Sequence, residues 1–127
     1  MITADDNNIT LAGFADEEEL ARRLAAADFH LIALRPGWEG IVVPSKFFAS
    51  LAMGRPVLFS GGKGSEINGW IRQFNLGYNL NMDFIKELEA LLEKKECVSR
   101  LQENALAAYK EHFSRRKMVQ KICGQII

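Results

Sequence analysis

The sequence predicts an α/β fold: a doubly wound, three-layer domain with about four parallel strands and C-terminal helices. Short apolar runs alternate with amphipathic helix patterns between residues 9 and 80, which favours parallel strands joined by right-handed crossovers. The run over residues 29–34 is almost wholly apolar, as in strands that helices cover on both faces. From residue 83 onward the apolar residues recur only at helical spacing. Together these observations indicate one Rossmann-like domain over residues 1–127.

The first part of the chain predicts two strands around a helix. Residues 9–14 alternate between apolar and polar or small residues and stop at a glycine, which is typical of a short strand. Asp16 then predicts the N-cap of a helix to about residue 27, and Glu19 completes a capping box. The second strand covers residues 29–34 and ends at a proline-glycine pair.

The middle of the chain predicts two further strand–helix pairs. Pro44 suits the first position of a helix, where its missing N–H costs little, and Gly54 suits the position just past the helix end. A strand over residues 56–59 follows. Ser65 predicts the N-cap of the next helix, which leads to a weak strand over residues 77–80.

Composition excludes several classes of function. Of the 127 residues 48% are hydrophobic and 25% charged, and the 16 basic residues balance the 16 acidic ones. This balance argues against a nucleic-acid-binding surface or a broad membrane surface. Cys97 and Cys123 lack the spacing of metal ligands and are expected to be reduced, so the sequence predicts no metal. Cysteines and histidines do not cluster in the sequence as a redox or metal protein requires, and we expect no cofactor.

The sequence also bears on where the protein resides. The N-terminus is acidic where a signal peptide would be basic, and no run reaches the roughly 20 apolar residues that span a bilayer. We therefore expect a soluble, cytoplasmic protein with no transmembrane segment. This expectation is compatible with a peripheral position at a membrane in a longer protein.

The segment from residue 35 to residue 60 predicts where a ligand would bind. Its loop carries Glu39 and Gly40, and the helix that follows carries Ser45 and Lys46 in its first turn. In a parallel sheet such loops and helix starts lie at the carboxyl ends of the strands, where these sheets bind ligands. A helix N-terminus offers free N–H groups and partial positive charge to a phosphate, and Lys46 adds a cation.

These residues resemble the later part of the C-terminal domain of GT-B glycosyltransferases, the group that includes family 4. The resemblance rests on AAD at 26–28, EG at 39–40, PSK at 44–46 and AMGRPV at 52–57, in this order. The closing FSRR at 113–116 also fits. Enzymes of this group transfer a sugar from a nucleotide-diphosphate donor to an acceptor hydroxyl. Their C-terminal domain holds the donor, and their N-terminal domain supplies most of the acceptor site.

The resemblance implies a donor-binding role for five residues. Glu39 matches a glutamate that contacts the donor sugar, and Gly40 lets the backbone approach it closely. Ser45 and Lys46 would hold the diphosphate, and Glu66 matches an acid near the nucleotide. The resemblance identifies no catalytic residue here, and it implies no metal.

Two departures from the family pattern affect what this chain is expected to do. Ala49 stands where the family has a second glutamate that holds the ribose. The first two βα units of the domain, with an Arg/Lys pair for the diphosphate, are missing, as is the acceptor domain. We therefore expect the chain alone to be inactive, although the parent protein would be a hexosyltransferase-type enzyme acting in polysaccharide biosynthesis.

The missing units also affect the sheet. In the family strand order, 3-2-1-4-5-6, the missing strands separate residues 9–14 from residues 29–34. The two segments therefore either pair directly or leave an edge open. An open edge readily recruits another chain, so we expect a homodimer or a strand pairing unlike that of the family.

Each site residue also has a structural interpretation. Glu39 is otherwise a solvated loop acid, and Lys46 a surface lysine. Glu66 belongs otherwise to a helix start capped by Ser65, and the glycine-rich stretch at 61–64 is a flexible loop, because it lacks the Walker A spacing. His30 is expected to be a satisfied sheet-end histidine, and Trp38 either stacks on a ligand or packs its loop.

The alternative function, favoured by Ala49, is a non-catalytic binding or scaffolding module.

Overall fold

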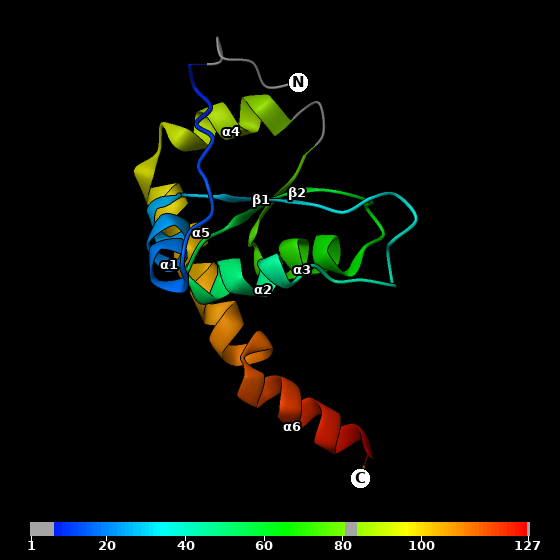
Figure 1. Ribbon diagram of the computed structural model, residues 1–127. Coiled ribbons are helices and arrows are strands. Elements are labelled where there is room, and N and C mark those ends of the chain that lie inside the picture. Colours follow the sequence, from blue (N-terminus) through cyan, green and yellow to red (C-terminus); the bar gives the residue numbers. More distant parts are fainter. Residues whose placement is uncertain (1–6, 81–83, 127) are drawn as a thin grey trace.

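A computed structural model describes residues 7–80 and 84–126 (Figure 1). Strands and helices alternate up to residue 79, and the rest of the described chain is helical, as the sequence predicts. The elements are, in chain order, α1 (Glu17–Ala26), β1 (His30–Ala33), α2 (Ser45–Ala52), β2 (Val57–Ser60), α3 (Glu66–Phe74), β3 (Gly77–Asn79), α4 (Phe84–Leu92), α5 (Lys95–Ala108), the π-helix η1 (Tyr109–Phe113) and α6 (Arg115–Ile126).

The sheet has three parallel strands in the order β1-β2-β3. His30 on β1 lies opposite Val57 on β2, and Val57 lies opposite Gly77 on β3. Helices α2 and α3 make the two crossovers between these strands. The α/β class and the three later strands are therefore confirmed, whereas the expected number of about four strands is too high.

The strand predicted over residues 9–14 is wrong. These residues form irregular chain, and the side chains of Leu11 and Phe14 are fully or largely exposed. A strand needs a neighbour to satisfy its backbone groups, and here the Gly13 carbonyl accepts a hydrogen bond from Arg23 Nη1 at 2.9 Å instead. Within residues 7–80 and 84–126, no strand pairs with the outer edge of β1, so that edge of the sheet is open.

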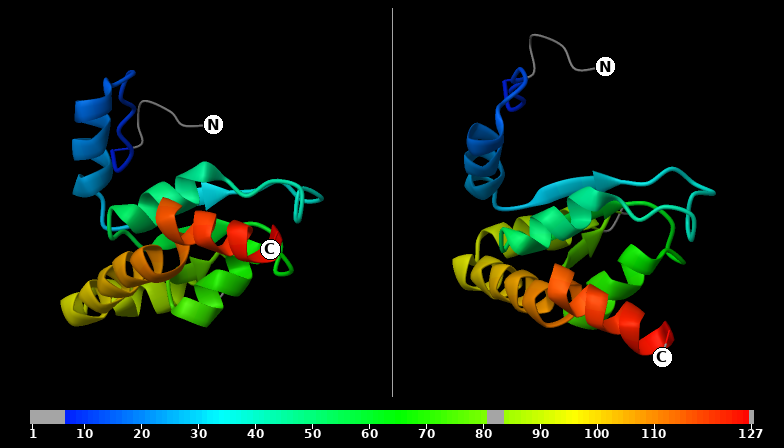
Figure 2. Two further views of the ribbon diagram at one scale, coloured as in Figure 1. Left: turned by 90° about the horizontal axis from the view of Figure 1, so that it is seen from below. Right: turned by 60° about the horizontal axis from the view of Figure 1, so that its bottom comes forward.

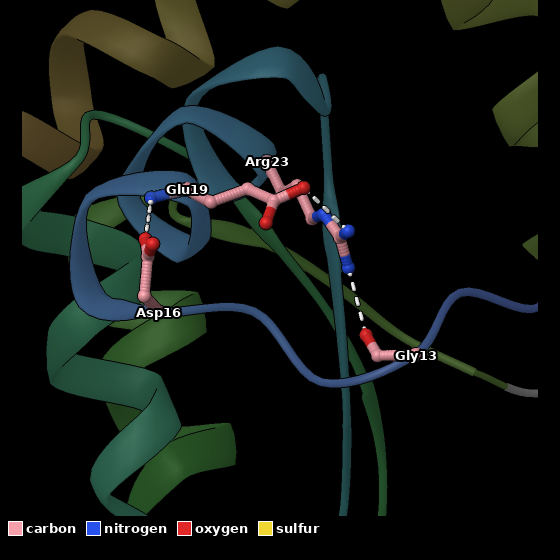
Figure 3. A network of polar contacts seen from close by, with 4 residues as sticks. All are labelled: Gly13, Asp16, Glu19 and Arg23. Atoms are coloured by element: carbon pink, nitrogen blue, oxygen red, sulfur yellow. Dashed lines mark hydrogen bonds and ion pairs between the residues drawn. The ribbon is translucent and has the colours of Figure 1, made fainter.

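Helix α1 begins where the sequence predicts. The Asp16 carboxylate accepts a hydrogen bond from the Glu19 N–H at 2.8 Å, and the Glu19 carboxylate pairs with Arg23 at 2.6 Å (Figure 3). No residue between Glu17 and Ala26 is buried, and α1 projects from the rest of the molecule (Figure 2). Hydrogen bonds and an ion pair between residues close in the sequence therefore stabilise α1 more than burial against the rest of the molecule does.

The hydrophobic core lies between the sheet and helices α2, α3 and α5 with η1. Phe47 is its centre: its ring stacks on Trp70 with centroids 5.5 Å apart and meets Phe113 edge-on at 6.0 Å. Figure 1 shows α2 and α3 on one side of the strands and α4 on the other. The buried apolar residues of this core are Ile32, Leu34, Phe47, Leu51, Val57, Phe59, Ile67, Ile71, Leu76, Ala105, Ala108 and Phe113.

The C-terminal helices leave part of their apolar surface uncovered. Helix α6 follows η1 and extends away from the sheet (Figure 1), with Met118, Val119 and Ile122 exposed. Across the part of the chain that the structure describes, no helix combines the length and hydrophobicity needed to cross a bilayer.

Candidate functional site

Two loops meet at the carboxyl ends of β1 and β2, where the sequence predicts the site. The half-buried Glu39 accepts a hydrogen bond from the Gly37 N–H at 2.7 Å through Oε2. Its Oε1 lies so close to Gly62 that a Cβ at that position would be 2.3 Å away. Gly40 has φ +80°, which glycine adopts readily. The Glu39 carboxylate therefore joins the β1–α2 loop to the glycine-rich β2–α3 loop.

A buried amide network holds the β2–α3 loop. Asn68, only 5% exposed, donates to the Lys63 carbonyl at 2.7 Å and accepts from the Asn79 amide at 3.0 Å. Asn79 also donates to the Gly61 carbonyl. Neither Asn68 nor Asn79 belongs to a sequence motif that predicts a site. In the sequence, Asn68 is visible only as a polar residue beside the apolar stripe of α3. Its position does not reveal that Asn79 is its hydrogen-bond partner.

The start of α2 differs from the starts of α1 and α3. Asp16 and Ser65 accept backbone hydrogen bonds at the N-termini of α1 and α3. Pro44 makes no side-chain cap at α2, and the first turn of α2 contains no acidic residue. Uncapped N–H groups and the helix dipole make such a terminus suitable for an anion. Lys46, exposed in that first turn, adds positive charge.

An apolar groove of about 570 Å³ runs beside this helix start, between α1, β1 and α2. Ser45 and Lys46 line it, and so does Ala49. Ala49 therefore contributes a methyl group where the family resemblance implies a ribose-binding carboxylate. The full lining is Leu20, Leu24, Phe29, His30, Leu31, Ile32, Ser45, Lys46, Ala49 and Ser50.

His30 is a satisfied sheet-end histidine, as expected. Its Nε2 lies 2.8 Å from the Leu24 carbonyl and its Nδ1 lies 2.7 Å from Ser50 Oγ. Because a carbonyl oxygen only accepts hydrogen bonds, Nε2 carries a proton. Both ring nitrogens are thus engaged in tying α1 to α2, which fits a structural role.

The five predicted site residues fall into three places. Ser45 and Lys46 line the groove, whereas Glu39 and Gly40 lie in the neighbouring loop and Glu66 lies exposed in the first turn of α3. Ser65 caps α3 as predicted, accepting from the Asn68 N–H at 3.2 Å. The roles of the five residues in binding a donor stay predictions.

Metal-ligating side chains do not cluster here. Among residues 7–80 and 84–126, no three His, Cys, Asp or Glu residues form a group that would hold a metal ion. Cys97 and Cys123 are both free thiols.

Comparison with known proteins gives one partial likeness. A stretch of 56 residues, 44% of this chain, is 41% identical to a protein of Pseudomonas aeruginosa described as "Probable glycosyltransferase WbjE". That stretch is 14% of the relative's length, so the chain spans a small part of it. No family model and no solved structure matches. The likeness supports a relationship to glycosyltransferases over this stretch.

Proposed function

We propose that this chain is the donor-binding part of a GT-B glycosyltransferase and binds a nucleotide-diphospho-sugar at the N-terminus of α2. The observation that carries the proposal is the uncapped start of α2, with Lys46 in its first turn, beside a groove that runs along β1 between α1 and α2. The partial identity to a probable glycosyltransferase supports the same assignment.

The proposed chemistry requires stabilisation of a leaving group. The acceptor oxygen forms a bond to the anomeric carbon, the bond from that carbon to the diphosphate oxygen breaks, and the proton of the acceptor hydroxyl is released to solvent. Negative charge grows on the departing nucleoside diphosphate, and fixed dipoles and cations stabilise such charge. The free N–H groups of α2, Ser45 and Lys46 would serve this purpose, while Glu39 accepts hydrogen bonds from sugar hydroxyls and Glu66 lies toward the nucleotide.

Most of the acceptor site would come from the N-terminal domain of the family. We therefore propose that these 127 residues bind a donor without turning it over. The two free cysteines fit a reducing, cytoplasmic location, which we propose for the protein.

Calorimetric titration with UDP-, GDP- and ADP-sugars tests donor binding. We expect one class of donor to bind, and Lys46→Ala or Glu39→Ala to raise its Kd by about tenfold to a hundredfold, since a hydrogen bond to a charged group contributes about 1.5–3 kcal/mol. Lys110→Ala and Glu103→Ala, exposed on η1 and α5, are the matched controls and should bind like the wild type.

The outcome of this titration separates the two candidate functions. A folded wild-type protein that binds none of the donors would contradict the donor-binding proposal and favour the non-catalytic binding or scaffolding module. The exposed methyl group of Ala49 in the groove is the observation that favours this second function, because it cannot accept hydrogen bonds from a ribose.

We also propose that two copies of the chain associate through the open edge of β1. The His30 and Leu34 N–H groups point to β2, so those of Leu31 and Ala33 point to the open edge. Leu31 is 67% exposed there, and unpaired backbone groups with apolar side chains promote pairing between chains.

Light scattering coupled to sizing chromatography tests this association. The wild type should elute as a dimer, and Leu31→Lys should elute as a monomer because a charge at the edge opposes strand pairing. Val119→Lys, an equally radical change on the exposed face of α6, should leave the dimer intact. A monomeric wild type would contradict the proposal.

A further inference from the structure

A second cavity lies along β3, at the opposite edge of the sheet from the α2 groove beside β1. It has a volume of about 430 Å³, within the usual range of small-ligand pockets, about 300–1,000 Å³. Residues of the β2–α3 loop, α3, β3 and α4 line it. They are Lys63, Asn68, Ile71, Arg72, Asn75, Gly77, Tyr78, Asn79 and Glu87. None of them lines the α2 groove.

One wall of this cavity is a fixed array of amides. The hydrogen bonds from Asn79 to Asn68 and from Asn68 to the Lys63 carbonyl span α3, β3 and the loop. Since Asn68 is 5% exposed, its amide is held in one orientation. Polar groups that packing has already ordered lose little entropy when a ligand binds.

The charges around the cavity are mixed, with an excess of positive charge. Lys63 and Arg72 supply two exposed cations, and Glu87 supplies one carboxylate. Arginine suits phosphate recognition because its planar guanidinium donates two parallel hydrogen bonds. A carboxylate and several amides in the same cavity suit hydroxyl groups, since they accept the hydrogen bonds that hydroxyls donate.

Tyr78 contributes an aromatic ring to the same cavity. Burial, and next the carboxylate of Glu87, raise the pKa of Tyr78 above its ordinary value of 10.0. Its phenol is therefore neutral at neutral pH, and its aromatic side chain adds apolar area to a lining that is otherwise mostly polar.

We propose that this cavity binds a small phosphorylated polyol, the chemical class of a sugar phosphate, with Arg72 and Lys63 on the phosphate and Glu87, Asn75 and Asn79 on the hydroxyls. The residues proposed to hold the donor do not line this cavity, although the β2–α3 loop borders both sites, and the proposal does not depend on donor binding. A chain that failed to bind nucleotide sugars would still carry this cavity.

Amide chemical shifts of the ¹⁵N-labelled protein test the proposal with glucose 1-phosphate as the probe. We expect saturable shifts at Asn68, Tyr78 and Asn79. Inorganic phosphate alone and glucose alone should each bind at least tenfold more weakly. Arg72→Gln and Lys63→Gln together should weaken binding of the probe at least tenfold, and Glu87→Gln several-fold. Arg100→Gln with Lys110→Gln, both exposed on other helices, is the matched control.

Several results would overturn the proposal. They are the absence of saturable shifts along β3, equal binding of inorganic phosphate and the probe, and unchanged binding by the Arg72→Gln, Lys63→Gln protein. Far-UV circular dichroism of each variant shows that it is folded, and the altered side chains are exposed, so loss of binding would not reflect loss of structure.

Discussion

Replacing Gly77 with alanine is expected to detach β3 from the sheet and to remove more than about 3 kcal/mol from the free energy of unfolding. Gly77 has φ +145°, and a Cβ there would lie 1.9 Å from the carbonyl oxygen of Val57. The side chain of Val57 is fully buried, and its N–H donates to the Leu76 carbonyl at 2.9 Å. Because β2 and β3 are fixed in this way, neither backbone can move aside without breaking the hydrogen bonds between the two strands.

Urea denaturation followed by circular dichroism measures this effect. Gly69→Ala is the matched control, because Gly69 lies exposed within α3 and a Cβ there would meet nothing within 4 Å. Alanine at a helix position favours the helix by up to about 1 kcal/mol, so this variant should be as stable as the wild type or more so. A Gly77→Ala protein with the wild-type midpoint would show that the β2–β3 contact is not as described.

The second large effect is expected from Phe47→Ala, which should cost about 3–5 kcal/mol. Phe47 has no exposed surface, and its ring touches those of Phe48, Trp70 and Phe113 at centroid distances of 5.4 to 6.0 Å. Its removal leaves a cavity between α2, α3 and η1. Since domains are stable by only about 5–15 kcal/mol, this loss is a large share of the total.

Phe14→Ala supplies the comparison for this change. It deletes the same side chain at a fully exposed position, where little stability depends on it, so its unfolding midpoint in urea should stay near the wild-type value. Equal midpoints for Phe14→Ala and Phe47→Ala would contradict the assignment of Phe47 to the centre of the core.

The features that the sequence predicted correctly depend on local signals. Asp16 and Ser65 cap the helices they were expected to cap, because an N-cap acts on an N–H three residues away. Gly54 ends its helix with φ +66°, as a glycine after a helix end commonly does. Helix α2 begins one residue later than predicted, with Pro44 as its N-cap, which is an ordinary uncertainty for helix ends.

The features that it did not predict depend on neighbours distant in the sequence. Residues 9–14 alternate like a strand, but alternation cannot show whether a partner strand exists, and here the outer edge of β1 stays unpaired. The Asn68–Asn79 bond joins α3 to β3, and the Glu39–Gly62 approach joins two separate loops. For the same reason the resemblance alone could not show that Ser45 and Lys46 line one groove while Glu66 lies elsewhere.

The donor titration repeated with Ala49→Glu tests most directly whether the N-terminus of α2 holds a nucleotide-diphospho-sugar. Ala49 is exposed and lines the groove, so the variant should fold. A carboxylate there would accept hydrogen bonds from the ribose, and each such bond contributes about 1.5–3 kcal/mol. We expect Ala49→Glu to bind the donor at least about tenfold more tightly than the wild type, with amide shifts at Gly40, Ser45 and Lys46. Unchanged or weaker binding by Ala49→Glu, or shifts confined to other parts of the chain, would contradict donor binding at the N-terminus of α2.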